Sequence, residues 1–144
     1  MSIQESLEEL KAYKLSNWVL FVIGDNIHNP VLGEFAQVCI DKNVLYVCAA
    51  GRAGTGMDDL FDMEMVLREI EGRQMPAWYR SKDDILMTSW HHDLDEGFWF
   101  CTSLTSYEDH PIDTVLVVNL TAADYLPRIE DLALRIVNGW QPAD

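Results

Sequence analysis

The segment WVLFVIGD, from Trp18 to Asp25, decides the fold of this chain. Its first six residues, Trp18–Ile23, form an unbroken apolar run with the length of a strand, and Gly24 and Asp25 end that run. A strand that is apolar on both faces is typical of a parallel sheet covered by helices on each side. The segment therefore predicts a central β-strand in an α/β domain.

Three further apolar runs have a similar length and character, and helical patterns separate the four. They are Val44–Ala49, Ile85–Trp90 and Val115–Asn119. Strands that alternate with helices imply parallel pairing through right-handed crossovers. We therefore predict an α/β three-layer sandwich: a four-stranded parallel sheet in the order 2-1-3-4, flavodoxin-like or Rossmann-like, with flanking helices.

The helices carry start signals, because Ser, Thr, Asn and Asp side chains accept hydrogen bonds from the free N–H groups of a first turn. In the helix that follows Val44–Ala49, apolar residues at helical spacing predict the side that faces the core. These residues are Leu60, Met63, Leu67 and Ile70. The start signals are Ser2 with Glu5, the Asn29-Pro30 pair, Thr55 with Asp58, Asp93 with Glu96, and Thr121 with Asp124.

Length and composition indicate one domain over residues 1–144, with residues 1–14 as an N-terminal helix. No apolar run approaches the roughly 20 residues that span a bilayer, and the N-terminus lacks the features of a signal peptide. The three cysteines, Cys39, Cys48 and Cys101, are odd in number and have no C-x-x-C spacing, which predicts buried reduced thiols. We therefore expect a cytoplasmic protein.

The charge balance narrows the partners. The chain has 24 acidic and 10 basic residues, for a net charge of −14. Such a surface repels nucleic acid phosphates and anionic lipids, and it attracts basic proteins. We expect a basic protein partner, no nucleic acid and no membrane, although an acidic surface also serves solubility alone.

Several polar residues follow the predicted strands, where ligands bind in open parallel sheets. For the order 2-1-3-4 the strand order reverses between the first and third strands, which predicts that Asp25 and His91 lie within about 10 Å of each other. Candidate catalytic residues are Asp25, His91, His92 and Asp93, since imidazoles and carboxylates serve acid–base chemistry. Candidate ligand-binding residues of this loop rim are Asp25, His28, Arg52, Trp90 and His91. A structural interpretation stays open, in which Asp93 caps a helix, one histidine packs and the other is solvated.

The glycine-rich loop Gly51–Gly56 has the context of a phosphate cradle, but it lacks the P-loop pattern and acids follow it. Asp58 and Asp62 lie one helical turn apart and are weak candidates for Mg²⁺ ligands, while a solvated helix start explains them equally. We predict no cofactor and no metal.

One stretch resembles a known family. Thr88-Ser89-Trp90-His91-His92-Asp93, followed by Phe98-Trp99-Phe100, is similar to a motif in small uncharacterised bacterial proteins, where Thr-Thr-Trp-His precedes an acidic helix start. Ser89 replaces the second Thr of that motif. The family has no known activity, so the resemblance implies only that Trp90 and His91 matter.

Two functions remain, and a homo-oligomer is compatible with both. The first is an acidic bacterial protein-binding module, comparable to immunity proteins that inhibit a basic partner, with Trp78, Tyr79 and Trp140 as aromatic anchors. The second is a small enzyme or nucleotide-binding protein that uses the loop rim. We favour the first and expect no enzyme, because the chain contains no nucleophile motif such as G-x-S-x-G.

Overall fold

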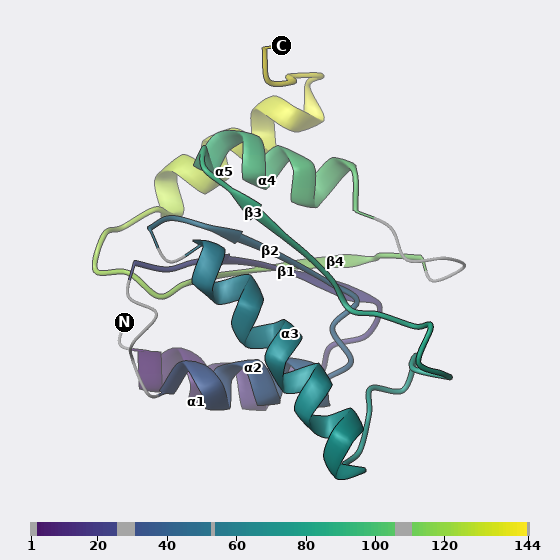
Figure 1. The fold of residues 1–144 in the computed structure, drawn as a ribbon. Helices are drawn as coiled ribbons and strands as arrows, with labels where there is room; N and C mark the ends of the chain where they lie inside the picture. Colours follow the sequence, from purple (N-terminus) through teal and green to yellow (C-terminus); the bar gives the residue numbers. More distant parts are fainter. Residues whose placement is uncertain (1–2, 26–30, 53, 106–110, 144) are drawn as a thin grey trace.

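The computed structural model describes residues 3–25, 31–52, 54–105 and 111–143. Within them, helices α1–α3 cover one face of a central sheet, and α4 and α5 cover the other, which confirms the α/β class and the three layers (Figure 1). No helix in this described part combines the length and apolar character that a membrane crossing needs. The elements are α1 (Ile3–Ala12), β1 (Trp18–Ile23), α2 (Val31–Asp41), β2 (Tyr46–Ala50), α3 (Gly54–Glu71), β3 (Met87–His91), α4 (Leu94–Ser103), β4 (Thr114–Asn119) and α5 (Leu126–Val137).

The four strands are all parallel, as predicted, but their order is 3-2-1-4. The predicted order 2-1-3-4 is wrong: β1 lies between β2 and β4, and β3 lies at the edge beside β2. The physical reason is burial. All five residues of β2 are buried, whereas β3 exposes Met87 and Trp90 and also carries Thr88 and Ser89. A wholly apolar strand is stabilised inside the sheet, and a partly polar one tolerates its edge.

The core is built around β1, every residue of which is buried. Phe21 packs edge-to-face against Phe98 of α4, with ring centroids 5.4 Å apart. On the other face of the sheet, Phe35 of α2 and Phe61 of α3 make a similar pair at 6.3 Å. Each side chain of this size contributes about 1.5–3 kcal/mol when it is fully buried, so β1 holds both layers together.

The helix start signals have mixed outcomes. Asp93 is the N-cap of α4, and its Oδ1 accepts from the amide of Asp95 at 2.8 Å, as predicted. Helix α3 begins at Gly54, so Thr55 lies inside the helix. Helix α5 begins at Leu126, which places Thr121 and Asp124 in the preceding turn. The Asn29-Pro30 and Ser2 signals lie outside the described residues.

The predicted core-facing side of α3 is wrong. Met63, Leu67 and Ile70 are exposed, and the buried residues of α3 include Phe61 and Met65. The buried side also holds a polar cluster centred on Arg68. Its Nε lies 2.9 Å from Glu64, and its Nη1 lies 2.8 Å from Asp41 of α2. The same guanidinium donates to the carbonyls of Gln37 and Gln74. The two sides of α3 have equivalent spacing, so periodicity alone could not choose between them.

The segment between α3 and β3 packs as a loop. Trp78 is buried, and its Nε1 donates to the carbonyl of Val44 at 3.0 Å. The amide of Ala77 donates to Asn43 Oδ1 at 2.7 Å. Trp78 is therefore a core residue, and its predicted role as an exposed anchor is wrong.

Candidate functional site

The loops after β1 and β2 meet at the carboxyl edge of the sheet. The amide of Gly24 donates to the carbonyl of Ala50 at 3.1 Å. Gly51 has a φ of +94°, and a side chain there would collide with the carbonyl oxygen of Gly24. Glycine at position 51 thus serves this close approach, because it alone fits both the conformation and the space.

The residues of the predicted loop rim are only partly brought together. Asp25 and Arg52 are exposed on the neighbouring loops after β1 and β2, and His28 lies outside the described residues. Asp25 and His91 do not leave adjacent strands, since β2 separates β1 from β3. The predicted distance of about 10 Å between Asp25 and His91 depended on adjacent strands, so the observed strand order removes its basis.

His91 points into the layer between the sheet and α4. It is buried, its Nε2 lies 2.8 Å from Ser89 Oγ, and its ring lies 4.8 Å from that of Phe100. Gly97 of α4 lies directly above the imidazole. His92, in contrast, is exposed and contacts the ring of Trp90 at 5.8 Å. With Asp93 as a helix cap, these positions match the structural interpretation of the motif.

A buried thiol pair lies beside His91. Cys48 of β2 and Cys101 of α4 are both fully buried, and Ser89 is the strand partner of Cys48. Hydrogen bonding by Cys101, and then by His91 and Ser89, holds the pKa of the Cys48 thiol below its usual range, although burial opposes this. The hydrogen bond to Cys48, together with burial, raises the pKa of Cys101. Neither cysteine is exposed, so both thiols are shielded from reagents in solvent while α4 covers the sheet.

The two candidate metal ligands differ in their contacts. Burial, with the charge of Asp59, raises the pKa of Asp58. Burial also raises the pKa of Asp62, although Thr88 Oγ1 donates to this carboxylate at 3.3 Å. Among the residues that the structure describes, no group of three or more His, Cys, Asp or Glu side chains is arranged to hold a metal ion.

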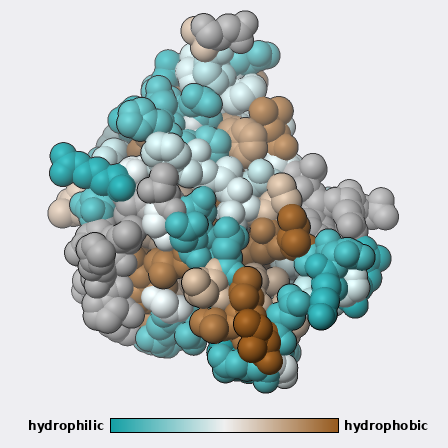
Figure 2. All heavy atoms as spheres, viewed as in Figure 1, coloured by the Kyte–Doolittle hydropathy of each residue, from teal (hydrophilic) through white to brown (hydrophobic). Residues whose placement is uncertain are grey.

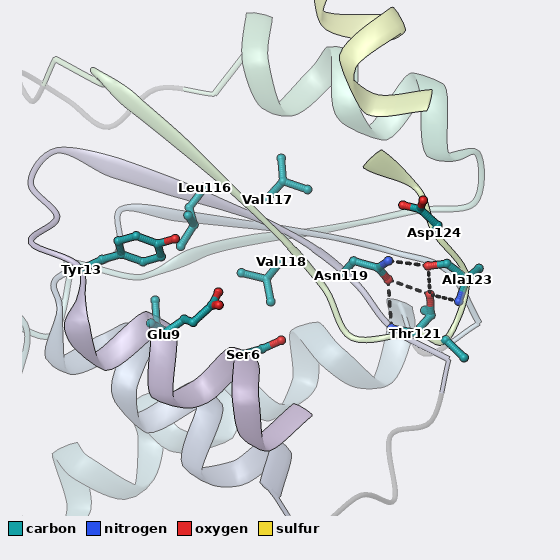
Figure 3. A pocket seen from close by; sticks show the side chains of 12 residues that line it. Ser6, Glu9, Tyr13, Leu116, Val117, Val118, Asn119, Thr121, Ala123 and Asp124 are labelled. Carbon is teal, nitrogen blue, oxygen red and sulfur yellow. Dashed lines mark hydrogen bonds between the residues drawn. The ribbon is translucent and has the colours of Figure 1, made fainter. Parts of the chain in front are cut away.

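The observed strand order moves the reversal point to the boundary between β1 and β4. A cavity of about 390 Å³ lies beside β4, between this strand and α1 (Figure 3). Ser6 and Glu9 of α1, with Tyr13 just after this helix, line one side of it, and Leu116 and Val118 line it from β4. No pattern considered in the sequence predicted this cavity. The usable signal was the spacing of Ser6 and Glu9, which puts two polar groups on one face of the N-terminal helix.

The molecule also has an exposed apolar surface that the sequence did not predict, and we call it the α3–β3 face. The outer stripe of α3 continues onto the start of β3, and Figure 2 shows this apolar surface on the lower half of the molecule. A groove of about 390 Å³ lies between the two elements and is lined by Val66, Ile85 and Met87 among others. The α3–β3 face consists of Met63, Val66, Leu67, Ile70, Ile85 and Met87.

Comparison with known proteins places the chain in a family. The chain belongs to the family described as a domain of unknown function, DUF7684, whose model matches residues 1–136. This agrees with the expected membership of an uncharacterised family. No curated protein and no solved structure matches the chain significantly.

Proposed function

We propose that this protein is a protein-binding module that docks a basic partner on its α3–β3 face. The observation that carries the proposal is the exposed stripe of α3. Met63 and Ile70 are 58% and 76% exposed, yet they occupy positions whose spacing is typical of a buried helix side. Contiguous exposed apolar side chains of this kind mark interaction surfaces, whereas isolated ones do not.

The charges around the α3–β3 face favour a basic partner. Asp59, Asp62 and Glu69 are exposed on the same helix, and the whole chain has a net charge of −14. One basic residue, Lys82, lines the groove. A second copy of the chain would bring the same acids against these, and like charges oppose such pairing. A partner with a basic rim and an apolar anchor fits both the charges and the groove.

Three finer features belong to the same proposal. An acidic module that sequesters a basic protein works as immunity proteins do, so we infer an inhibitory role. We infer a bacterial origin from the motif between Thr88 and Asp93, and a cytoplasmic location from the free thiols. The alternative, an enzyme at the loop rim, gains no specific observation, since His91 and Asp93 already have structural contacts.

The proposal is tested by capturing host proteins on the immobilised wild type and on two variants. The M63S/I70S variant truncates two exposed side chains of the α3–β3 face, and L134S/V137S truncates two on α5 as a matched control. Both should melt close to the wild type. We expect a basic host protein to bind the wild type and the control, and the M63S/I70S variant to lose at least about tenfold in affinity. A partner that binds all three equally, or one that is acidic, would refute the proposal.

The kinetics add a second test. Attraction between opposite charges is screened as the Debye length falls from about 30 Å at 0.01 M salt to about 10 Å at 0.1 M. The association rate with the captured partner should fall by about tenfold or more over this range, while dissociation changes less. An association rate that is the same at both salt concentrations would leave the acidic surface with no role in docking.

A further inference from the structure

We propose that the cavity between α1 and β4 binds the protonated ammonium group of an aliphatic amine. The amine is either a free alkylamine or the lysine side chain of a bound protein. This site is separate from the α3–β3 face, because α1 and β4 line it and α3 and β3 do not.

The cavity has an apolar wall and a polar wall. Leu116 and Val118 alternate along β4 and therefore face the same side of the sheet. Ser6 and Glu9 lie three residues apart on one face of α1, and Tyr13 follows directly after the end of this helix at Ala12. Figure 3 shows these three side chains on the side of β4 that carries Leu116 and Val118, with Tyr13 pointing toward Leu116. A volume of about 390 Å³ suits a small ligand.

Ser6 is a buried polar side chain with no hydrogen-bond partner among the described residues. It is 8% exposed and lines the cavity. Its oxygen faces the cavity, where it can accept a hydrogen bond from a ligand donor or a water. Glu9 and the Tyr13 hydroxyl likewise make no side-chain hydrogen bond to the described part of the chain, so the polar wall is available to a ligand.

The charge of the lining selects a cation. Its ionisable groups are the carboxylates of Glu9 and Asp124 and the phenol of Tyr13, and no Lys, Arg or His is among the lining residues that the structure describes. Lys42 touches Tyr13 from outside, where its ammonium is already bonded to the Tyr13 carbonyl at 2.6 Å. An anionic ligand would therefore find acids and no counter-charge, whereas an ammonium would find Glu9.

The end of the cavity is held in shape by a tight turn after β4. Asn119 Oδ1 accepts from the amide and the hydroxyl of Thr121, at 2.9 and 2.6 Å, and Asn119 Nδ2 donates to the carbonyl of Ala123 at 2.6 Å (Figure 3). These groups are occupied with each other, so they position the wall and leave recognition to α1. A preformed wall reduces the ordering cost of binding.

The fit to an alkylammonium follows from these parts. An ammonium has three donors and no acceptor, and Ser6 and Glu9 offer a hydroxyl and a carboxylate. The aliphatic stem then packs on Leu116 and Val118, with the Tyr13 ring beside it. An ammonium held by a carboxylate is bound by a charge-assisted hydrogen bond, which is stronger than a neutral one.

Titrations with 1,5-diaminopentane and with Nα-acetyl-lysine amide, followed by NMR of amide resonances at 0.15 M salt, test the site. We expect saturable shifts confined to α1, β4 and the turn after β4. Glu9→Gln should weaken binding by about tenfold or more, since it removes the charged acceptor. Glu8→Gln removes the same charge from the same helix outside the cavity and should change affinity less than twofold. Ser6→Ala should also weaken binding.

The two probes separate the sources of the ammonium. Binding of the diamine supports a free ligand, and binding of the lysine derivative alone supports a lysine of a partner protein. Pentanol and pentanoate, which lack the ammonium, should not bind. Shifts spread over the whole acidic surface, equal binding by the wild type and Glu9→Gln, or no binding of either amine would overturn the proposal. The M63S/I70S variant should bind both amines unchanged, so the outcome is independent of the α3–β3 face.

Discussion

Gly97 lies directly on His91: a Cβ built on Gly97 would stand 2.7 Å from the Cβ of His91 and 3.3 Å from a ring carbon of Phe21. Neither contact involves the far end of a flexible side chain. The absence of a side chain at Gly97 therefore allows α4 to pack against β1 and β3, with the imidazole enclosed between them.

Gly97→Ala is expected to destabilise the domain by about 1–3 kcal/mol, because the added methyl group forces α4 away from the sheet. Urea unfolding followed by circular dichroism measures the effect. Gly33→Ala is the matched control: position 33 is also within a helix, but nothing lies within 4 Å of a Cβ there. This control should stabilise the domain by up to about 1 kcal/mol, since Ala favours helix over Gly. Equal effects of the two variants would contradict the close packing of α4.

Arg68→Ala is expected to cost up to about 3–5 kcal/mol, because it removes the buried partner of the Glu64 carboxylate and leaves this carboxylate to the more exposed Arg73, whose Nη1 lies 3.4 Å away. Arg68 is 5% exposed and joins α3 to Asp41 and the Gln37 carbonyl of α2. Arg135→Ala removes an exposed pair with Asp131 and a cation–π contact with Trp140 at 5.0 Å, and it should cost about 1 kcal/mol. Thermal or urea unfolding compares the two. A small loss for Arg68→Ala would mean that the buried cluster is replaced by water at little cost.

Asp62→Asn is expected to raise the melting temperature at pH 7. Although the residue as a whole is exposed, partial burial of its carboxylate, with the charges of Asp58 and Asp59, raises the folded-state pKa of Asp62 above the ordinary value of 3.8, so folding favours the protonated carboxyl. The stability contributed by that group is fully present below pH 3.8 and is lost as pH rises through the raised pKa. The advantage of the variant should therefore shrink as the pH is lowered from 7 toward 4. The asparagine oxygen can still accept from Thr88, which isolates the effect of charge.

Melting curves of the wild type, Asp62→Asn and the exposed control Asp83→Asn, recorded between pH 4 and 8, provide the measurement. A difference between the wild type and Asp62→Asn that is constant across this range would show that the charge of Asp62 costs the folded state nothing.

The three cysteines are expected to resist iodoacetamide while the protein is folded and to accept three labels after denaturation. The lowered pKa of Cys48 favours its reactive thiolate, but burial beneath α4 denies the reagent access. Intact-mass spectrometry counts the labels. Rapid single labelling of the native protein at Cys48 would show that α4 opens readily from the sheet.

Local patterns accounted for much of this fold. The apolar run Trp18–Ile23 predicted a strand buried on both faces, and β1 has the same bounds with every residue buried. Asp93 predicted a helix start, and its carboxylate caps α4. These features depend on neighbouring residues and on hydrophobic burial, which the order of side chains along the chain records directly.

Tertiary packing decided the rest. The polar residues of Met87–His91 were compatible with an edge strand. The order 3-2-1-4 follows because β2 is wholly apolar and gains more than β3 from a position inside the sheet. That order places the reversal point between β1 and β4, and it separates the strands that precede Asp25 and contain His91. Likewise, α3 has two sides with helical spacing, and the sheet selected the one with Phe61 and Arg68. The buried side packs Phe61 against Phe35 of α2 and pairs Arg68 with Asp41 of α2, and these long-range contacts are not recorded in any local pattern.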